Sequence, residues 1–287
     1  MGCGRAIEAD AFDSQGKQVT ELVITGAGSG LCDSILEVID AVEGDYRLRL
    51  VDSMQSAGEA RRFQGRTVVI ELATEADLAT ADVVFDLDGA YVGDALVFKP
   101  TASLFVMLKR LLSDLAVDSI KTLHGVVREP AVMEQQGVEA LAGQVTQLFN
   151  GRDPEPQPFG GTLAFNTRTL DESAVVESLH DVDALRNANI SIERLQSDSF
   201  YTVHASLWLQ MADAQLIDLM ISQSTDQYSA GLGISPDSGR VTNDSGMRVC
   251  VRQIAKDWVH VMLTADLEKT IWAREAHDVL KNYLTAT

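Results

Sequence analysis

A glycine-rich segment near the start of the chain is where the sequence is best suited to phosphate chemistry. Residues 21–25 form an apolar, β-rich run, residues 26–30 carry three glycines, and apolar residues at helical spacing follow. A strand, a glycine turn and a helix present backbone N–H groups and a helix dipole to a phosphate. Leu31 and Cys32 occupy the region where the dinucleotide fingerprint has its last glycine, so the motif is degraded. The predicted cofactor-binding residues in this turn are Gly26, Gly28, Ser29 and Gly30.

Asp52 and Ser56 extend this candidate site. Asp52 ends the next expected strand, at about the offset of the acid that binds the ribose in NAD enzymes. An aspartate that closes a strand is also a common turn residue, and both interpretations stay open. Ser56 lies in the small polar loop that follows, and we include it among the predicted cofactor-binding residues.

The thiol groups are scattered along the chain. Cys3, Cys32 and Cys250 contain no Cys-x-x-Cys pair, and the histidines show no metal-ligand spacing with one another. We therefore expect neither a disulfide framework nor a metal site. Free thiols of this kind are typical of a reducing compartment, so we predict a cytoplasmic protein.

The charge balance excludes two classes of partner. Lys plus Arg number 23 and Asp plus Glu number 42, which gives a net charge of −19. A surface this acidic repels phosphate backbones and anionic membrane leaflets, so we expect no nucleic-acid and no membrane partner. The sequence also contains no run of 18 apolar residues that would span a bilayer.

Strands and helices alternate in the first part of the chain. This alternation predicts βαβ units and a mostly parallel, Rossmann-like sheet over residues 19–115. Residues 1–18 are polar and aperiodic, and we interpret them as a loose tail. The expected strands are residues 21–25, 46–51, 66–72, 82–85 and 95–98, and the expected helices begin at Leu31 and span residues 103–115.

The pattern changes after residue 115. Residues 201–210 alternate between an apolar face and a face with His204 and Trp208, which predicts an antiparallel strand with one side open to a site or partner. Residues 116–266 therefore form a predicted α+β domain, and a C-terminal helix within residues 267–287 completes the first domain. Other expected elements here are a helix over 132–149 and paired strands over 248–254 and 258–264.

Several segments resemble the aspartate-semialdehyde dehydrogenase family. Residues 56–65 resemble the family's second βα connection, and residues 137–144, 148–151 and 163–166 resemble its second domain in order. Residues 200–205 match the Usg-type branch, bacterial homologues that lack the enzyme's residues. The similarity runs from about residue 20 to residue 284.

The resemblance implies an NAD(P)-binding domain and an α+β domain for catalysis and dimerisation. It implies NADP or NAD as the cofactor and a homodimer as the assembly. In the family reaction a cysteine thiolate attacks the aldehyde, a hydride passes to the nicotinamide, and phosphate cleaves the thioester. His204 matches the family's general base.

This sequence departs from the family at the catalytic positions. The segment that should hold the nucleophile, residues 97–103, contains no cysteine, and we interpret its hydroxyl groups as helix N-caps. Ser197 stands where the family has the arginine that binds the substrate carboxylate. His204 is thus the one remaining catalytic position, and we rank a structural role in its strand, hydrogen-bonded to neighbours such as Thr202 or Ser206, ahead of a catalytic one because no nucleophile lies nearby.

Three functions remain open. The first is a catalytically inactive homologue that acts as a dimeric binding protein with a protein partner that the sequence does not name. The second is an NAD(P)-dependent oxidoreductase that acts on an aldehyde or semialdehyde. The third is a nucleotide-binding sensor without hydride transfer. We rank them in this order because the nucleophile is missing.

Overall fold

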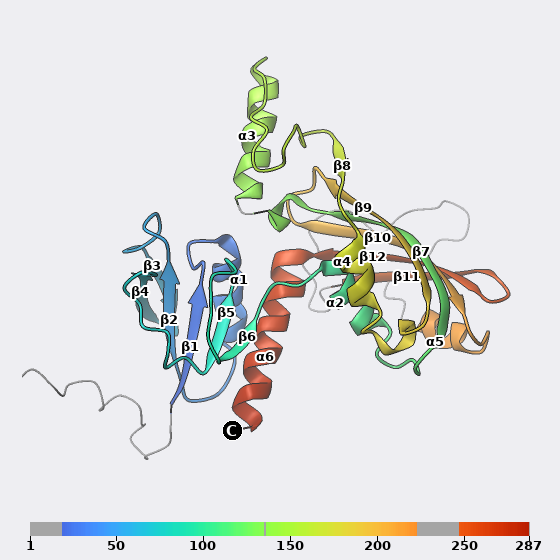
Figure 1. Ribbon diagram of the computed structural model, residues 1–287, viewed down its shortest axis with the longest axis horizontal. Helices are drawn as coiled ribbons and strands as arrows, with labels where there is room; N and C mark the ends of the chain where they lie inside the picture. The colour runs from blue at the N-terminus through green and yellow to red at the C-terminus, as the bar shows by residue number, and fades with distance from the viewer. Residues whose placement is uncertain (1–18, 135, 223–246, 287) are drawn as a thin grey trace, which may run out of the picture. The chain divides into compact units, whose positions relative to one another are not determined.

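The computed structural model describes residues 19–134, 136–222 and 247–286 (Figure 1). These residues divide into two compact units, one of residues 19–100 with 272–286 and the other of the described residues between 101 and 271. The predicted tail, residues 1–18, lies outside the described residues. No helix in the described part of the chain is long and apolar enough to cross a membrane.

The first unit is built on a six-stranded sheet in the order β3-β4-β2-β1-β5-β6 (Figure 1). All neighbouring strands are parallel except β3 and β4, which pair as a hairpin. The strand order reverses between β1 and β5, which is the arrangement of a Rossmann-type sheet. The strands are β1 Thr20–Thr25, β2 Tyr46–Asp52, β3 Ala60–Phe63, β4 Arg66–Leu72, β5 Val83–Asp86 and β6 Leu96–Phe98.

Helices and loops both pack around the sheet of the first unit. Helices α1 (Gly30–Ile39) and α6 (Ala273–Ala286) pack against each other within the first unit. The face formed by Val23, Val51 and Val84 is instead covered by partly buried hydrophobic residues of the connecting loops. Loops replace crossover helices there because the connections after β4 and β5 are short. These loop residues are Ala76, Leu78, Ala81, Tyr91 and Ala95.

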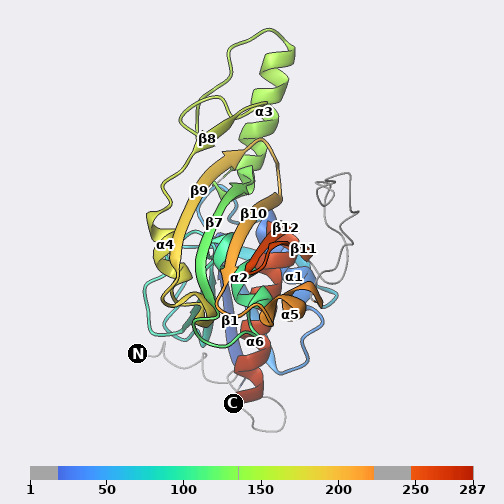
Figure 2. The ribbon, with the colours of Figure 1, turned by 90° about the vertical axis from the view of Figure 1, so that its right-hand side faces the viewer.

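The second unit contains a mixed sheet in the order β11-β12-β10-β7-β9-β8. Its neighbours are antiparallel except for β7 and β9, and Figure 2 shows β9, β7 and β10 side by side. The two sheets confirm the predicted α/β class with a Rossmann-like and an α+β part. The strands are β7 Ile120–Glu129, β8 Thr167–Thr169, β9 Asn189–Ser197, β10 Thr202–Met211, β11 Met247–Ala255 and β12 Trp258–Asp266.

Three helices differ from the sequence-based expectation. Helix α2 (Ser103–Leu111) ends four residues early, and the C-terminal helix begins with a π-helical segment, Leu267–Trp272. Helix α3 (Gly137–Phe149) starts five residues late because Ala131–Met133 forms a separate 3-10 turn. A Cβ on Gly137 would lie 1.9 Å from the Ala131 carbonyl oxygen, so the two segments approach too closely for one continuous helix. Helices α4 (Ser173–Leu179) and α5 (Leu216–Ser222) complete the second unit.

Candidate functional site

The predicted glycine turn lies at the carboxyl end of β1. Gly26 adopts a left-handed backbone conformation with φ +66°, and a Cβ there would lie 3.2 Å from the Asp88 backbone nitrogen. Helix α1 then begins at Gly30, and its N-cap residue, Ser29, makes no side-chain capping bond. The first N–H groups of a helix have no acceptor inside the helix. The turn lies at the edge where Rossmann-type sheets bind ligands, but the N–H groups of Ala27, Ser29 and Cys32 already donate to carbonyl oxygens of the chain.

Asp52 and Ser56 lie against the middle of this turn. The Asp52 carboxylate accepts a hydrogen bond from the Gly28 N–H group through Oδ2. A Cβ on Gly28 would lie 2.0 Å from Ser56 Oγ and 2.8 Å from Asp52 Oδ2. The structure thus brings together Gly28, Asp52 and Ser56 from two neighbouring strand ends. Only a glycine leaves room for this approach.

Two more carboxylates lie at the end of β5, and we did not predict them as site residues. Thr25 Oγ1 lies 2.9 Å from Asp86 Oδ1 and 2.7 Å from Asp88 Oδ1, so the two carboxylates share its one hydroxyl proton. Asp86 is buried and forms an ion pair with Lys99, Nζ to Oδ2 2.9 Å. Burial alone would raise the pKa of Asp86, but the Lys99 ammonium and the Thr25 hydroxyl together lower it. The sequence signal that could have revealed these two carboxylates is Asp86-Leu87-Asp88, directly after an apolar strand.

The groups at this edge fit only part of the donor set that a dinucleotide requires. The Asp52 carboxylate suits the hydroxyl groups of a ribose. A pyrophosphate needs backbone donors, and those of Ala27, Gly28 and Ser29 are already hydrogen-bonded within the chain. The space that a Cβ at Gly28 would take is filled by the side chains of Ser56 and Asp52, so it is not left open for a phosphate. The positive charge of Lys99 is already paired with the carboxylate of Asp86.

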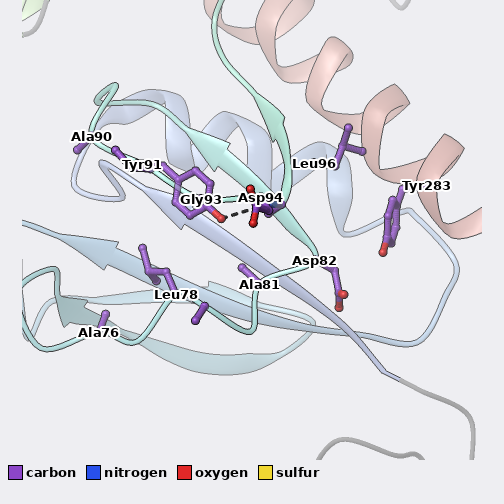
Figure 3. Close-up of a pocket in the computed structure, with 13 residues that line it drawn as sticks. Ala76, Leu78, Ala81, Asp82, Ala90, Tyr91, Gly93, Asp94, Leu96 and Tyr283 are labelled. Atoms are coloured by element: carbon purple, nitrogen blue, oxygen red, sulfur yellow. Dashed lines mark hydrogen bonds between the residues drawn. The ribbon is translucent and has the colours of Figure 1, made fainter.

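A cavity of about 830 Å³ lies on the loop-covered side of the first unit (Figure 3). Small apolar residues line most of it, together with Asp82, Asp94, Tyr91 and Tyr283. Burial, and then the Asp82 charge, raise the pKa of Tyr283. None of the 13 lining residues is a lysine or arginine, so the cavity does not suit a phosphate group.

His204 lies on β10 in the second unit, half-buried between two neighbouring strands. It is cross-strand from Arg128 on β7 and from Thr264 on β12, whose hydroxyl lies 3.2 Å from His204 Nδ1. Burial, and then the Arg128 charge, lower the pKa of His204. The imidazole is therefore neutral at neutral pH and able to accept a proton. The sequence did not reveal Arg128 or Thr264 as neighbours of His204, because each lies at least 60 positions away from it along the chain.

The segment that should hold a nucleophile connects β6 to α2. The prediction that its hydroxyl groups cap the helix is wrong for Ser103, because Ala102 occupies the N-cap position. The buried Ser103 hydroxyl instead donates to Glu129 Oε1 at 3.1 Å. The other carboxylate oxygen of Glu129 accepts from Arg194 Nε at 2.7 Å. The hydroxyl thus belongs to a buried hydrogen-bond network, since Glu129 lies between Ser103 and Arg194.

The remaining predicted positions offer no thiolate and no substrate arginine. Cys32 is buried, and this burial, followed by the Asp33 charge, raises the pKa of its thiol to about 12. Cys250 is buried in β11. Ser197, which replaces the expected arginine, donates its hydroxyl to the Glu129 carbonyl oxygen at 3.3 Å. Cys3 lies outside the described residues.

The more exposed face of the second sheet carries two aromatic–imidazole pairs. Trp208 stacks on His260 with 4.8 Å between ring centroids, and His124 stacks on Trp258 at 6.2 Å. Ser206 Oγ lies 2.8 Å from His260 Nε2, which orients that imidazole. Within the described residues, no group of three or more His, Cys, Asp or Glu side chains is arranged to hold a metal ion.

Comparison with known proteins gives one consistent result. No protein-family model and no curated protein sequence matches the chain. Among solved structures, a probable aspartate-semialdehyde dehydrogenase from Pseudomonas aeruginosa has a TM-score of 0.75 at 17% sequence identity. That match covers 94% of this chain and 99% of the other.

Two further solved structures agree with it. Aspartate semialdehyde dehydrogenase II from Vibrio cholerae has a TM-score of 0.74 at 18% identity, covering 94% of this chain and 99% of its own. Aspartate semialdehyde dehydrogenase from Francisella tularensis has a TM-score of 0.67 at 11% identity, covering 92% and 100% respectively. At these identities the comparison establishes the fold. The chain has the two-domain fold of the aspartate-semialdehyde dehydrogenases.

Proposed function

We propose that the chain is a homologue of the aspartate-semialdehyde dehydrogenases that is inactive in the family reaction and acts as a dimeric, cytoplasmic binding protein. One observation carries the proposal. The connection from β6 to α2 contains Thr101, Ala102 and Ser103 where the family resemblance requires a cysteine. Neither Cys32 nor Cys250 replaces it, since both are buried.

The chemistry explains why this loss matters. The family reaction passes through a thioester, and only a thiolate sulfur can form one. The Ser103 hydroxyl cannot take this role, and it is already hydrogen-bonded to the Glu129 carboxylate. A histidine without a nucleophile to activate does not complete the reaction, so His204 alone supports no acyl transfer.

Specific observations favour two other functions. The lowered pKa of His204 and its contact with Thr264 suit a neutral general base, which an oxidoreductase acting on an aldehyde or semialdehyde would use. The strand, glycine turn and helix of residues 20–39 favour a sensor that binds a nucleotide without hydride transfer, and such binding would require Asp52 to release the Gly28 N–H group. NADP or NAD is the cofactor class in both cases.

The test is an activity measurement on the purified full chain. We expect no oxidation of aspartate semialdehyde above background with phosphate and either NADP or NAD. The matched controls are Cys32→Ala and Cys250→Ala. A robust rate of the wild-type chain would overturn the proposal, and loss of that rate in either variant would identify the buried thiol as the nucleophile.

A further inference from the structure

We infer that the cavity on the loop-covered side of the first unit binds a small organic cation with an apolar body. Figure 3 shows this cavity, whose volume is about 830 Å³. Small-molecule sites typically have volumes of about 300–1,000 Å³. The inference goes beyond the proposed function, because it concerns neither the family reaction nor the dimer.

The fold leaves this cavity because loops connect the strands on that side of the sheet. The connection from β4 to β5 and the connection from β5 to β6 supply most of the lining. Asp82 directly precedes β5, and Leu96 is the first residue of β6, so the cavity reaches the amino ends of these strands. The glycine turn follows the carboxyl end of β1, and none of its residues lines the cavity.

Hydrophobic side chains would hold the apolar body of such a ligand. Leu78, Tyr91 and Ala95 line the cavity and pack against the buried valines of the sheet. Leu96 and Val92 also line it, and they are 46% and 94% exposed. A ligand that covers these side chains removes apolar surface from water, which favours binding.

The charges of the lining select a cation. Asp82 and Asp94 contribute two carboxylates, and the lining contains no lysine or arginine. Asp82 Oδ2 accepts the Glu21 N–H group at 2.8 Å, which orients this carboxylate without neutralising it. Arg49 also lies beside Glu21, but its guanidinium group is paired with Glu21 at 2.8 Å and with Glu71 at 2.7 Å. The negative potential of the cavity therefore favours a positively charged ligand.

An aromatic ring accompanies each carboxylate. Figure 3 shows Tyr283 of helix α6 near Asp82, and Tyr91 near Asp94. The Tyr91 hydroxyl accepts the Ala95 N–H group at 3.3 Å, which holds the ring beside the residue that follows Asp94. The face of an aromatic ring attracts a cation, so the phenol rings and the carboxylates favour the same ligand charge.

The experiment titrates the full chain with three probes and follows the backbone amide signals by TROSY NMR. The probes are 2-phenylethylamine, 2-phenylethanol and 3-phenylpropionate, which share an aromatic body and are positive, neutral and negative at pH 7. We expect the amine to bind at least about tenfold more tightly than the alcohol, and the propionate to bind more weakly than both. The largest shifts should fall within residues 76–82 and 90–96.

Two variants test the carboxylates. We expect Asp94→Asn to weaken amine binding about threefold, because one partly solvated charge is removed. The double variant with Asp82→Asn and Asp94→Asn should bind the amine and the alcohol about equally. Asparagine at position 82 keeps an oxygen for the Glu21 N–H group. The matched control is Asp153→Asn, an exposed position in the second unit, and it should leave the amine affinity unchanged.

Three results would overturn the inference. The first is a wild-type chain that binds all three probes equally or shows no saturable shift with millimolar amine. The second is an unchanged amine affinity in both Asp94→Asn and the double variant. The third is a set of saturable shifts confined to residues outside the lining. None of these results bears on the oxidation of aspartate semialdehyde, so the inference and the proposed function fail separately.

Discussion

At the scale of one residue, Cys32 shows that burial can make a cysteine thiol unreactive. Its side chain is fully buried in helix α1, and the pKa of its thiol is raised to about 12. A thiol with this pKa carries almost no thiolate at pH 8, and thiolate is the reactive form. The presence of a cysteine in the sequence therefore does not indicate a nucleophile.

We predict that Cys32 and Cys250 do not react with a disulfide reagent in the native protein. The measurement uses a Cys3→Ser variant at pH 8, so that the thiol outside the described residues makes no contribution. Both buried thiols should react only after denaturation in guanidinium chloride. Rapid labelling of the folded protein would contradict the burial of these side chains.

His204 gives a second prediction for a single residue. Burial and the Arg128 charge hold its pKa below the usual value, so the folded state resists protonation more than the unfolded state does. The free energy of unfolding is then highest above about pH 6.5, the unfolded pKa, and decreases as pH falls below it. NMR titration of the imidazole should show an upward pKa shift in Arg128→Ala, because a nearby positive charge is removed.

The control for this titration uses the other shifted histidine of the same sheet. Burial and then the Arg252 charge lower the pKa of His260. Arg252→Ala should raise the pKa of His260 and leave that of His204 in place. A similar change at both histidines in either variant would indicate a general loosening of the sheet rather than two local charge effects.

At the scale of the element, the same substitution should have opposite effects in two places. A Cβ on Gly28 would meet Ser56 Oγ at 2.0 Å, whereas a Cβ on Gly143 in helix α3 meets nothing within 4 Å. We expect Gly28→Ala to lower the free energy of unfolding by about 1–3 kcal/mol through overpacking. Gly143→Ala should raise it by about 0.5–1 kcal/mol, since alanine favours a helix.

Thermal and urea unfolding followed by circular dichroism would measure both effects. A Ser56→Gly substitution added to Gly28→Ala should recover part of the loss, because it removes the nearest clashing atoms. Recovery is only partial, since Asp52 Oδ2 would still lie 2.8 Å from the new Cβ. Equal stability of wild-type and Gly28→Ala protein would show that the turn is more open than the structure indicates.

At the scale of the whole molecule, we predict a homodimer formed through the exposed face of the second sheet. Trp208 on this face is 37% exposed although it is stacked on His260, and aromatic residues are enriched at interface centres. Light scattering should give about 62 kDa, twice the 31.1 kDa of one chain. The dimer should persist in about 0.5 M salt, because screening relieves repulsion between acidic chains and leaves apolar burial intact.

Two variants separate this interface from general surface effects. Trp208→Arg should give a mass near 31.1 kDa, because it places a charge in the centre of the buried patch. Val92→Ser alters a residue of the first unit that is 94% exposed and should not change the mass. A wild-type mass near that of a single chain would disprove the dimer.

The sequence by itself determined the fold class and those elements whose hydrophobic pattern is local. The glycine turn after residues 21–25 and the period-two alternation over residues 201–210 are local patterns, and the structure has β1, α1 and β10 where they predict them. Such patterns can be recognised in a sequence because each reflects which face of a single helix or strand is buried. The helix starting at Gly137 was predicted five residues early, since its start depends on a close approach to Ala131 that periodicity does not encode.

Only the tertiary structure decided which side chains meet. The ion pair of Arg194 with Glu129 joins residues 65 positions apart, and the contact of Thr264 with His204 joins residues 60 apart. These contacts depend on the order and register of strands, and a shift of one residue would turn each side chain to the other face of the sheet. The sequence named Asp52 as either a turn residue or a ribose ligand. The parallel pairing of β2 with β1 places its carboxylate beside the turn, where it accepts the Gly28 N–H.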